Sequence, residues 1–456
     1  MEKIILKIKK LINNSKTLDY LSIGSLLAFL LLKLPPIYLN IAMSKLITTY
    51  SAAKFFLLIN LLIYVLTFKA FVLKRIFYNV TFMALLIYFI SQSVSIFKAL
   101  DIILFIKQYQ NVFFEIVIFV LAVFMAQQKN FTSKFRILIY ITLFIVLFFE
   151  FFFLFFNDVF ISFFSNIIQK ELIDLYIYNL NRERHNLYLN TEFFLPFIFF
   201  RLFEAVKEKN NKNAIVNFIL IFIIGGLSLA SKFRTKFFQF IFGFFVSSYL
   251  VFQKAEIRLS KFFLIIIIAF ITLLSSLFLM IRWTSSYDIV DRLLLQDDIQ
   301  DVGSVIYRVD SFKQAIDLAK YSPLIGVGLG NYGNYVNKNK GAGIADKIRK
   351  NRYYATLNDP HSRISLIISE TGLFGLFSYL FLIFIFIRSD YFQLINFKKN
   401  REHNSFSTSL ILSSWTLFLF SIFSSFNTVF TNGWFWLLRG IIEGLKIKKK
   451  LYGVEK

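Results

Sequence analysis

The sequence contains no cysteine, which excludes disulfide bonds, thiolate nucleophiles and cysteine-ligated metal sites. Charged residues are also scarce: they make up 17% of the 456 residues, whereas soluble domains contain about a quarter. The three histidines, His185, His361 and His403, lie in three separate segments, which argues against a histidine-ligated metal. We therefore predict neither a metal site nor a soluble globular domain.

Apolar residues dominate the composition instead, at 57% of the chain with 62 phenylalanines. Residues 262–281 alone form an uncharged stretch that is long enough to cross a hydrocarbon core of about 30 Å. Similar windows recur throughout, so we predict an all-α integral membrane protein of about twelve transmembrane helices, with residues 1–456 forming a single polytopic domain. The predicted spans are 20–41, 52–68, 79–97, 112–127, 137–156, 192–206, 214–230, 237–253, 262–281, 361–387, 407–424 and 429–445.

The formal net charge of +24 is distributed as an orientation signal. Lysine and arginine gather at the N-terminus, in every second connection between spans and at the C-terminus, and basic residues in short loops favour the cytoplasmic side. This alternation predicts that both termini are cytoplasmic. The first residues lack the small-residue cleavage site of a signal peptide, so we expect an uncleaved tail. A nucleic-acid partner is not expected, because it would require a basic face on a folded soluble surface.

Two connections on the predicted outer side are long, at about 157–191 and 283–360, and long loops are usually functional or disordered. The second contains an amphipathic helix pattern in RVDSFKQAIDLAKYSP, and we expect this helix to lie along the membrane surface as a lid. Its predicted apolar face comprises Val305, Val309, Phe312, Ile316 and Ala319. Pro323 should end the helix before a turn rich in glycine, at Gly326, Gly328 and Gly330.

His361 is the strongest candidate for chemistry, because it begins a predicted span at the outer interface, directly after Asp359 and Pro360. A histidine side chain can accept a proton from an attacking hydroxyl at neutral pH, which suits a general base. The alternative is a structural residue that caps a helix at the level of the lipid headgroups. Position alone does not separate the two interpretations.

Arg234 lies with Lys232 and Lys236 in a short outer connection, where basic residues oppose the orientation rule. Cations in such a place are a functional hypothesis, and an anionic partner is the expected reason. Arg234 could hold a phosphate with two parallel hydrogen bonds, or its side chain could simply extend to the interface. Arg308, in the long outer loop, is a candidate for a second phosphate or for pairing with a neighbouring aspartate.

In this order along the chain, these features resemble the O-antigen ligase and O-antigen polymerase superfamily. The matching elements are Arg234, Arg308, the segment PLIGVGLGN at 323–331, Pro360-His361, and ETGLFGL at 370–376. The sequence departs from the family pattern at two positions: Phe233 replaces the usual serine before the arginine, and Ser362 replaces the asparagine that commonly follows the histidine. Motifs cover roughly residues 190–385, and the remainder is similar only in hydropathy.

The resemblance implies a GT-C-like membrane glycosyltransferase that needs no metal and no cofactor. It implies transfer of a glycan from an undecaprenyl-pyrophosphate-linked donor to a hydroxyl of a glycan or lipid A-core acceptor, at the outer face of a bacterial cytoplasmic (inner) membrane. His361 would act as the base, while Arg234, Arg308 and Lys232 would bind the pyrophosphate or glycan. Such a reaction belongs to lipopolysaccharide or surface polysaccharide biosynthesis.

Two alternatives remain open. A polymerase of the same superfamily joins repeat units instead of attaching a finished glycan, and no motif in the sequence identifies the acceptor. A flippase or other transporter has a similar number of spans, but it would need charges along a membrane pathway and no large outer domain. The 283–360 loop argues against the transporter.

Overall fold

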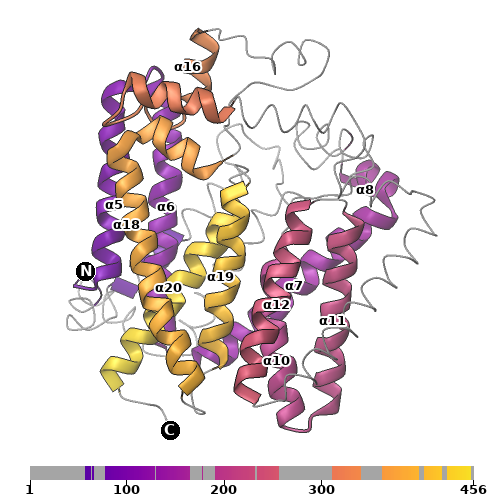
Figure 1. The fold of residues 1–456 in the computed structure, drawn as a ribbon. Coiled ribbons are helices and arrows are strands. Elements are labelled where there is room, and N and C mark those ends of the chain that lie inside the picture. Colours follow the sequence, from indigo (N-terminus) through magenta and orange to yellow (C-terminus); the bar gives the residue numbers. More distant parts are fainter. Residues whose placement is uncertain are drawn as a thin grey trace, which may run out of the picture.

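The computed structural model is all-helical in the part of the chain that it describes (Figure 1). The described residues are 57–62, 64–65, 76, 78–128, 130–164, 177, 191–231, 234–255, 311–339, 362–399, 405–423 and 429–452. The first half of the described chain forms α5 (Val80–Val94) with the short η2 (Ser95–Lys98), α6 (Ile102–Ala126), α7 (Phe131–Phe155), α8 (Asn157–Phe164), η3 (Glu192–Phe194), α10 (Leu195–Lys207), α11 (Asn211–Ala230) and α12 (Arg234–Ala255). The second half forms a helix at 311–321, then α16 (Tyr332–Asn339), α18 (Arg363–Lys399), α19 (Ser405–Phe423) and α20 (Val429–Tyr452).

Five described helices are long and apolar enough to cross a membrane: Val80–Lys98, Ile102–Ala126, Phe131–Phe155, Asn211–Ala230 and Arg363–Ile395. Two shorter apolar helices, Lys236–Val251 and Ser405–Leu419, accompany them. The chain is therefore a multi-pass membrane protein, as the composition predicts. The windows 20–41 and 262–281 lie outside the described residues and 52–68 is described only in part. The count of twelve spans stays a prediction.

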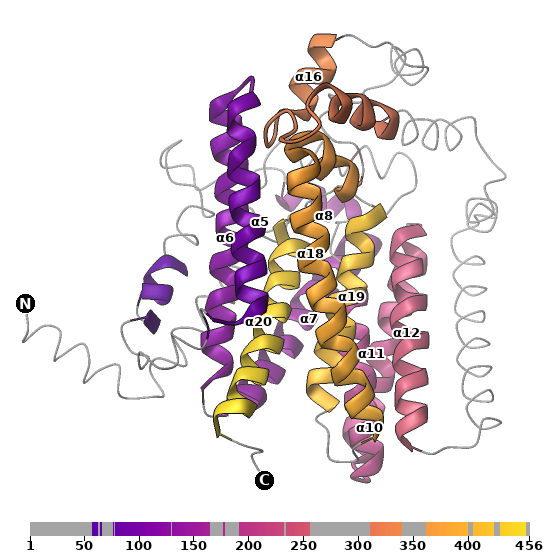
Figure 2. The ribbon, with the colours of Figure 1, turned by 60° about the vertical axis from the view of Figure 1, so that its left-hand side comes forward.

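The connections alternate between two ends of the bundle. The α5–α6 connection, α8, α16 and the beginning of α18 lie at one end, and the α10–α11 connection and the end of α20 lie at the other (Figures 1 and 2). This is the arrangement that the alternating basic segments predict, and we call the first of these ends the loop end. That the loop end faces outward, and that both termini are cytoplasmic, stay predictions.

Polar side chains define where several helices begin. Asn79 caps α5 by accepting a hydrogen bond from the Thr81 amide at 2.8 Å, and Asp101 caps α6 through the Leu104 amide at 2.9 Å. Such caps satisfy amide groups that have no partner within the helix. The helix α6 begins ten residues before the predicted window of 112–127, because Asp101 caps it. The prediction left out the first turns of this helix because they contain polar residues.

Small residues bring α6 and α20 into close contact in the core of the bundle. A Cβ atom on Gly440 would lie 2.3 Å from the Phe119 carbonyl oxygen, and one on Gly444 would lie 2.6 Å from the Cβ of Ala126. Pairs of small residues four positions apart allow backbones to approach in membrane proteins, where dispersion forces replace the hydrophobic effect between helices. The Gly440/Gly444 pair therefore sets the position of α20.

The predicted helix in the long loop is confirmed, and the side that packs against the protein differs from the predicted apolar face; that the helix lies along the membrane surface stays a prediction. The helix spans 311–321, and Phe312 on the expected apolar face is 50% exposed. The buried positions are Ser311, Ala315, Leu318 and Ser322, which pack toward Val327, Tyr332, Tyr335 and Val336. The loop forms a small core of its own, which we call the outer platform (residues 311–336). Val305 and Val309 lie outside the described residues.

Candidate functional site at the loop end

The glycine-rich turn and a break in α18 bind each other through their backbones. Gly372 has a non-helical conformation, with φ 64° and ψ −164°, so α18 consists of a first segment, 363–371, and a second segment, 373–399. Four backbone hydrogen bonds join the turn to this break: Val327 and Gly328 donate to the carbonyls of Ser369 and Glu370, both at 2.9 Å, and Leu373 and Phe374 donate to those of Pro323 and Leu324, at 2.8 and 3.1 Å. We call this arrangement the clasp.

The clasp satisfies backbone groups that the break would otherwise leave unpaired. A helix break removes intrahelical partners on both of its sides, and unpaired backbone groups are costly away from water. Gly326 and Gly328 have φ values of 68° and 96°, which favour glycine over residues with a Cβ atom. The amides of Val327 and Gly328 donate to carbonyls of α18, and those of Gly326 and Leu329 donate to Ser322 and Ser95. These four amides are therefore not available to bind a phosphate.

The outer platform is also anchored to the α5–α6 connection. Asn331 accepts a hydrogen bond from the Asp101 amide at 2.8 Å, and the Tyr335 hydroxyl donates to the Lys98 carbonyl at 2.9 Å. The Tyr332 hydroxyl donates to the Ser311 carbonyl at 3.1 Å, which holds the first turn of the 311–321 helix. The platform, the clasp and the tops of α5 and α6 therefore form one connected structure.

The break turns the first segment of α18 back toward the bundle. Arg363 donates a hydrogen bond from Nη2 to the Tyr88 hydroxyl at 3.1 Å, and the ring of Tyr88 lies 5.8 Å from that of Tyr379. A straight helix would separate residues 363 and 379 by about 24 Å. α18 bends near its beginning (Figure 2), and the break at Gly372 lets both residues contact Tyr88 of α5.

Ser362, which replaces the family's asparagine, is placed to cap this first segment. Its Oγ accepts a long hydrogen bond from the Ser365 amide at 3.4 Å, and its carbonyl accepts one from the Leu366 amide at 2.9 Å. Serine and asparagine are both among the preferred N-cap residues. Ser362 therefore caps the first segment of α18.

The structure gives no side-chain positions for the predicted site residues. His361, Arg308 and Lys232 lie outside the described residues, and Arg234 is the first residue of α12 but its side chain is not among those described. Three of these four lie next to described helix beginnings: Arg234 begins α12, Arg308 precedes the 311–321 helix, and His361 precedes α18. All three of these helices begin toward the loop end of the bundle (Figures 1 and 2).

Lys236 was predicted to lie with Arg234 in a basic outer connection, but its side chain forms an ion pair in the interior of the protein. It is 2% exposed and forms an ion pair with Glu150 of α7, whose other oxygen accepts from Thr191 at 3.2 Å. Glu192 is fully buried beside this pair, and its Oε1 accepts from Ser228 at 2.7 Å. Its Oε2 has no hydrogen-bond partner among the described residues. Lys236 thus joins α12 to α7 and is not available to a ligand.

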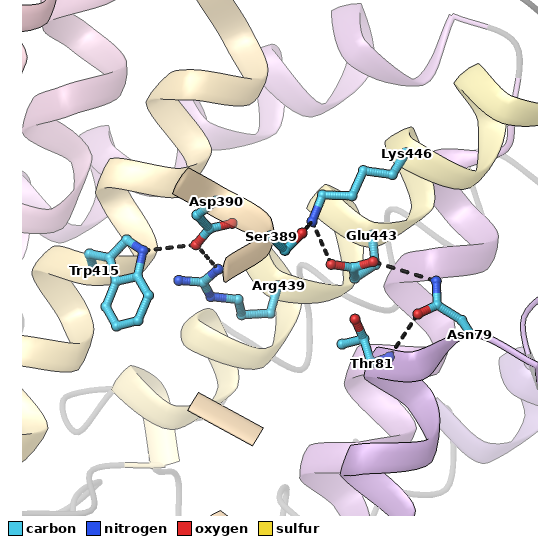
Figure 3. A network of polar contacts seen from close by, with 8 residues as sticks. All are labelled: Asn79, Thr81, Ser389, Asp390, Trp415, Arg439, Glu443 and Lys446. Atoms are coloured by element: carbon cyan, nitrogen blue, oxygen red, sulfur yellow. Dashed lines mark hydrogen bonds and ion pairs between the residues drawn. The ribbon is translucent and has the colours of Figure 1, made fainter. Parts of the chain in front are cut away.

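A second buried network lies at the opposite end of the bundle (Figure 3). Asp390 of α18 pairs with Arg439 of α20 and accepts from the Trp415 indole at 2.8 Å; the arginine and aspartate are 1% and 2% exposed. Nearby, Lys446 pairs with Glu443 at 2.6 Å, and Glu443 accepts from Asn79 of α5 at 3.5 Å. This network connects four helices far from the clasp, so we interpret it as structural.

Charged residues inside apolar windows are the signal that could have identified these groups from the sequence. Glu115, Glu150 and Arg439 all lie within predicted spans, where an ionisable side chain marks a functional or paired position. Their partners could not be identified, because each comes from a different helix. Among the described residues, no three histidine, aspartate or glutamate side chains are grouped to hold a metal ion.

The fold and the clasp define the class: a multi-pass, all-helical membrane protein with a structured platform at one end. A family model described as O-antigen ligase matches residues 218–380, from within α11 to within α18. The matched segment contains Arg234, Arg308, both halves of the clasp and His361, so the resemblance to the O-antigen ligase family is confirmed over residues 218–380. No curated protein shows significant similarity to the chain. The family implies a membrane glycosyltransferase that acts on lipid-linked glycans in envelope polysaccharide biosynthesis.

Proposed function

We propose that the protein transfers a glycan from an undecaprenyl-pyrophosphate-linked donor to an acceptor hydroxyl, at the loop end of the bundle and on the outer face of the bacterial cytoplasmic membrane. The observation that carries this proposal is that three described helices begin toward the loop end, each at or shortly after a residue of the family pattern in the sequence. Helix N-termini favour anions, and here arginines accompany them. A pyrophosphate is the anion that this combination suits.

In the proposed reaction, the acceptor oxygen attacks the anomeric carbon of the donor sugar as the bond from that carbon to the pyrophosphate oxygen breaks. His361 accepts the proton of the acceptor hydroxyl and later releases it to solvent. The pyrophosphate leaves as an anion, still attached to its lipid. Arg234 and Arg308, with Lys232 nearby, stabilise the charge that develops on it, and donors aimed at developing charge contribute most in a site with little water.

The reaction is proposed to be metal-independent because the arginines would supply the positive charge that a metal ion supplies elsewhere. Arginine also offers a planar pair of donors that matches two phosphate oxygens, whereas lysine offers a point charge. The lipid chain of the donor would lie against apolar helices near the beginning of α12. The outer platform would cover the sugars.

A ligase and a polymerase differ in the acceptor to which the glycan is transferred. We propose a ligase that uses lipid A-core as its acceptor. Gel analysis of surface polysaccharide in a deletion strain tests this. Long glycan chains that remain on the lipid carrier would identify a ligase, and acceptors carrying single repeat units would identify a polymerase. Normal polysaccharide in the deletion strain would contradict both assignments.

A further inference from the structure

We infer that Tyr88 and Arg363 form a positioning pair that holds the first segment of α18 at a defined depth in the bundle, two residues along the chain from His361. The inference rests on the proposed function for its consequence, because His361 is the proposed base. Tyr88 lies on α5 and Arg363 on α18, and neither belongs to the motifs of the family pattern. Neither is assigned a contact with the donor or the acceptor.

The contact between them is a directional, partly buried hydrogen bond. The Arg363 guanidinium donates to the Tyr88 hydroxyl at 3.1 Å, and Tyr88 is 1% exposed. The carboxylate of Glu115 on α6 contributes a favourable electrostatic interaction to the same guanidinium. Tyr88 is itself held by its ring contact with Tyr379. The arginine therefore reaches a preformed polar position between α5, α6 and the second segment of α18.

The depth of this position follows from helix geometry. Tyr88 precedes the end of α5 at Val94 by six residues, which corresponds to about 9 Å along the axis. The first segment of α18 is held by the clasp at its Gly372 end. At its other end, the Arg363–Tyr88 hydrogen bond ties it to α5. A short helical segment held at both ends keeps a fixed orientation.

His361 is only two residues from Arg363, so a change in the first turn of α18 would move its backbone as well. A misplacement of about 1 Å in a reacting group can lower the rate about a hundredfold. Removing the tyrosine hydroxyl should therefore lower turnover without removing any group from the site. Donor binding, which the proposed arginines supply, should be retained.

The first test compares Tyr88→Phe and Arg363→Lys with Ser378→Ala in purified protein reconstituted with lipid-linked donor. Ser378 is a matched control, because its Oγ bonds that of Ser91 at 2.6 Å across the same α5–α18 interface but belongs to the second segment. We expect kcat to fall about ten- to a hundredfold in the first two variants with the donor KM unchanged. Equal loss in the control, or unchanged turnover in both pair variants, would overturn the inference.

The second test does not depend on transfer. The chain has no cysteine, so a single cysteine can be introduced at Ile364 in the first segment or at Lys320 in the outer platform, both exposed positions. We expect Tyr88→Phe to change the rate of maleimide labelling at position 364 severalfold and to leave that at position 320 unchanged. Unchanged labelling at 364 would contradict the positioning pair. Changed labelling in a protein without transfer activity would retain the pair and reject the proposed function.

Discussion

Gly372 of α18 and Gly326 of the outer platform lie so close that neither position accommodates a side chain. A Cβ atom on Gly372 would lie 2.6 Å from the Gly326 nitrogen and 2.5 Å from the Leu324 carbonyl carbon. A Cβ atom on Gly326 would lie 2.3 Å from the Glu370 carbonyl carbon. These two glycines belong to the two motifs that define the family pattern in this region. The two glycines are 46 positions apart in the sequence, yet they are in direct contact in the structure.

Replacing Gly372 by alanine should disrupt the clasp. The positive φ alone costs a residue with a Cβ atom about 1–3 kcal/mol, and the backbone atoms around it cannot move aside as a side chain could. Thermal unfolding in detergent should show a clear loss of stability. Gly226→Ala in α11 is the control, because a Cβ atom there meets nothing within 4 Å and alanine favours a helix. Equal stability of both variants would contradict the clasp.

Lys236→Met should destabilise the protein by roughly 3–5 kcal/mol, because it leaves Glu150 and Glu192 buried without their shared cation. Lys320→Met is the comparison: this lysine pairs with Asp317 on the surface, where the side chains are 74% and 72% exposed, and such pairs contribute about 0–1 kcal/mol. Chemical denaturation of the purified variants measures both. Similar stabilities for the two variants would show that the buried pair is not needed.

Arg234→Ala should reduce activity and leave stability unchanged, whereas Lys236→Met should reduce stability. We expect transfer to be abolished while the amount of inserted protein stays at the wild-type level, since the proposed partner of Arg234 is the donor pyrophosphate. Arg234→Lys should restore little, because a lysine cannot form two parallel hydrogen bonds. In-membrane transfer assays with quantitative blotting test both variants. A lysine variant with full activity would remove the geometric requirement.

The Asp390–Arg439 pair should respond to single and double substitutions differently. Arg439→Met alone leaves a buried carboxylate and should cost roughly 3–5 kcal/mol, whereas Asp390→Leu together with Arg439→Met removes both charges and should cost less. Arg439 also lies over the rings of Trp415 and Phe386, at 4.6 and 4.7 Å, which a methionine can still contact. A double variant less stable than Arg439→Met alone would contradict this account, because it would show that Asp390 stabilises the protein without the arginine, through its hydrogen bond with Trp415.

Much of the fold was predictable, because apolar windows between polar connections define transmembrane helices whatever their partners. The predicted windows 79–97, 137–156, 214–230 and 407–424 match described helices within a few residues. The break in α18 was not predictable. Gly372 lies inside a continuous apolar pattern, and its non-helical conformation depends on amide and carbonyl partners from a loop more than forty residues earlier.

The motifs of the candidate site could be identified from the sequence, but the contacts between them could not. The glycine turn and the ETG segment were identified separately, but backbone hydrogen bonds between them leave no trace in residue type. Lys236 was grouped with Arg234 because they are neighbours in sequence, yet its partner Glu150 is on α7. The roles of His361, Arg234, Arg308 and Lys232 remain proposals.

The most direct test of the central claim is transfer by purified protein from undecaprenyl-pyrophosphate-linked glycan, measured across pH for the wild type and His361→Ala, together with donor binding. The variant should lose roughly two to four orders of magnitude in turnover and keep its donor affinity. Wild-type transfer should fall below about pH 6.5, where a histidine side chain becomes protonated and can no longer accept a proton, and this fall should be absent from the variant's residual activity. A variant that binds donor poorly but transfers bound glycan at the wild-type rate would contradict the assignment of His361 as the base.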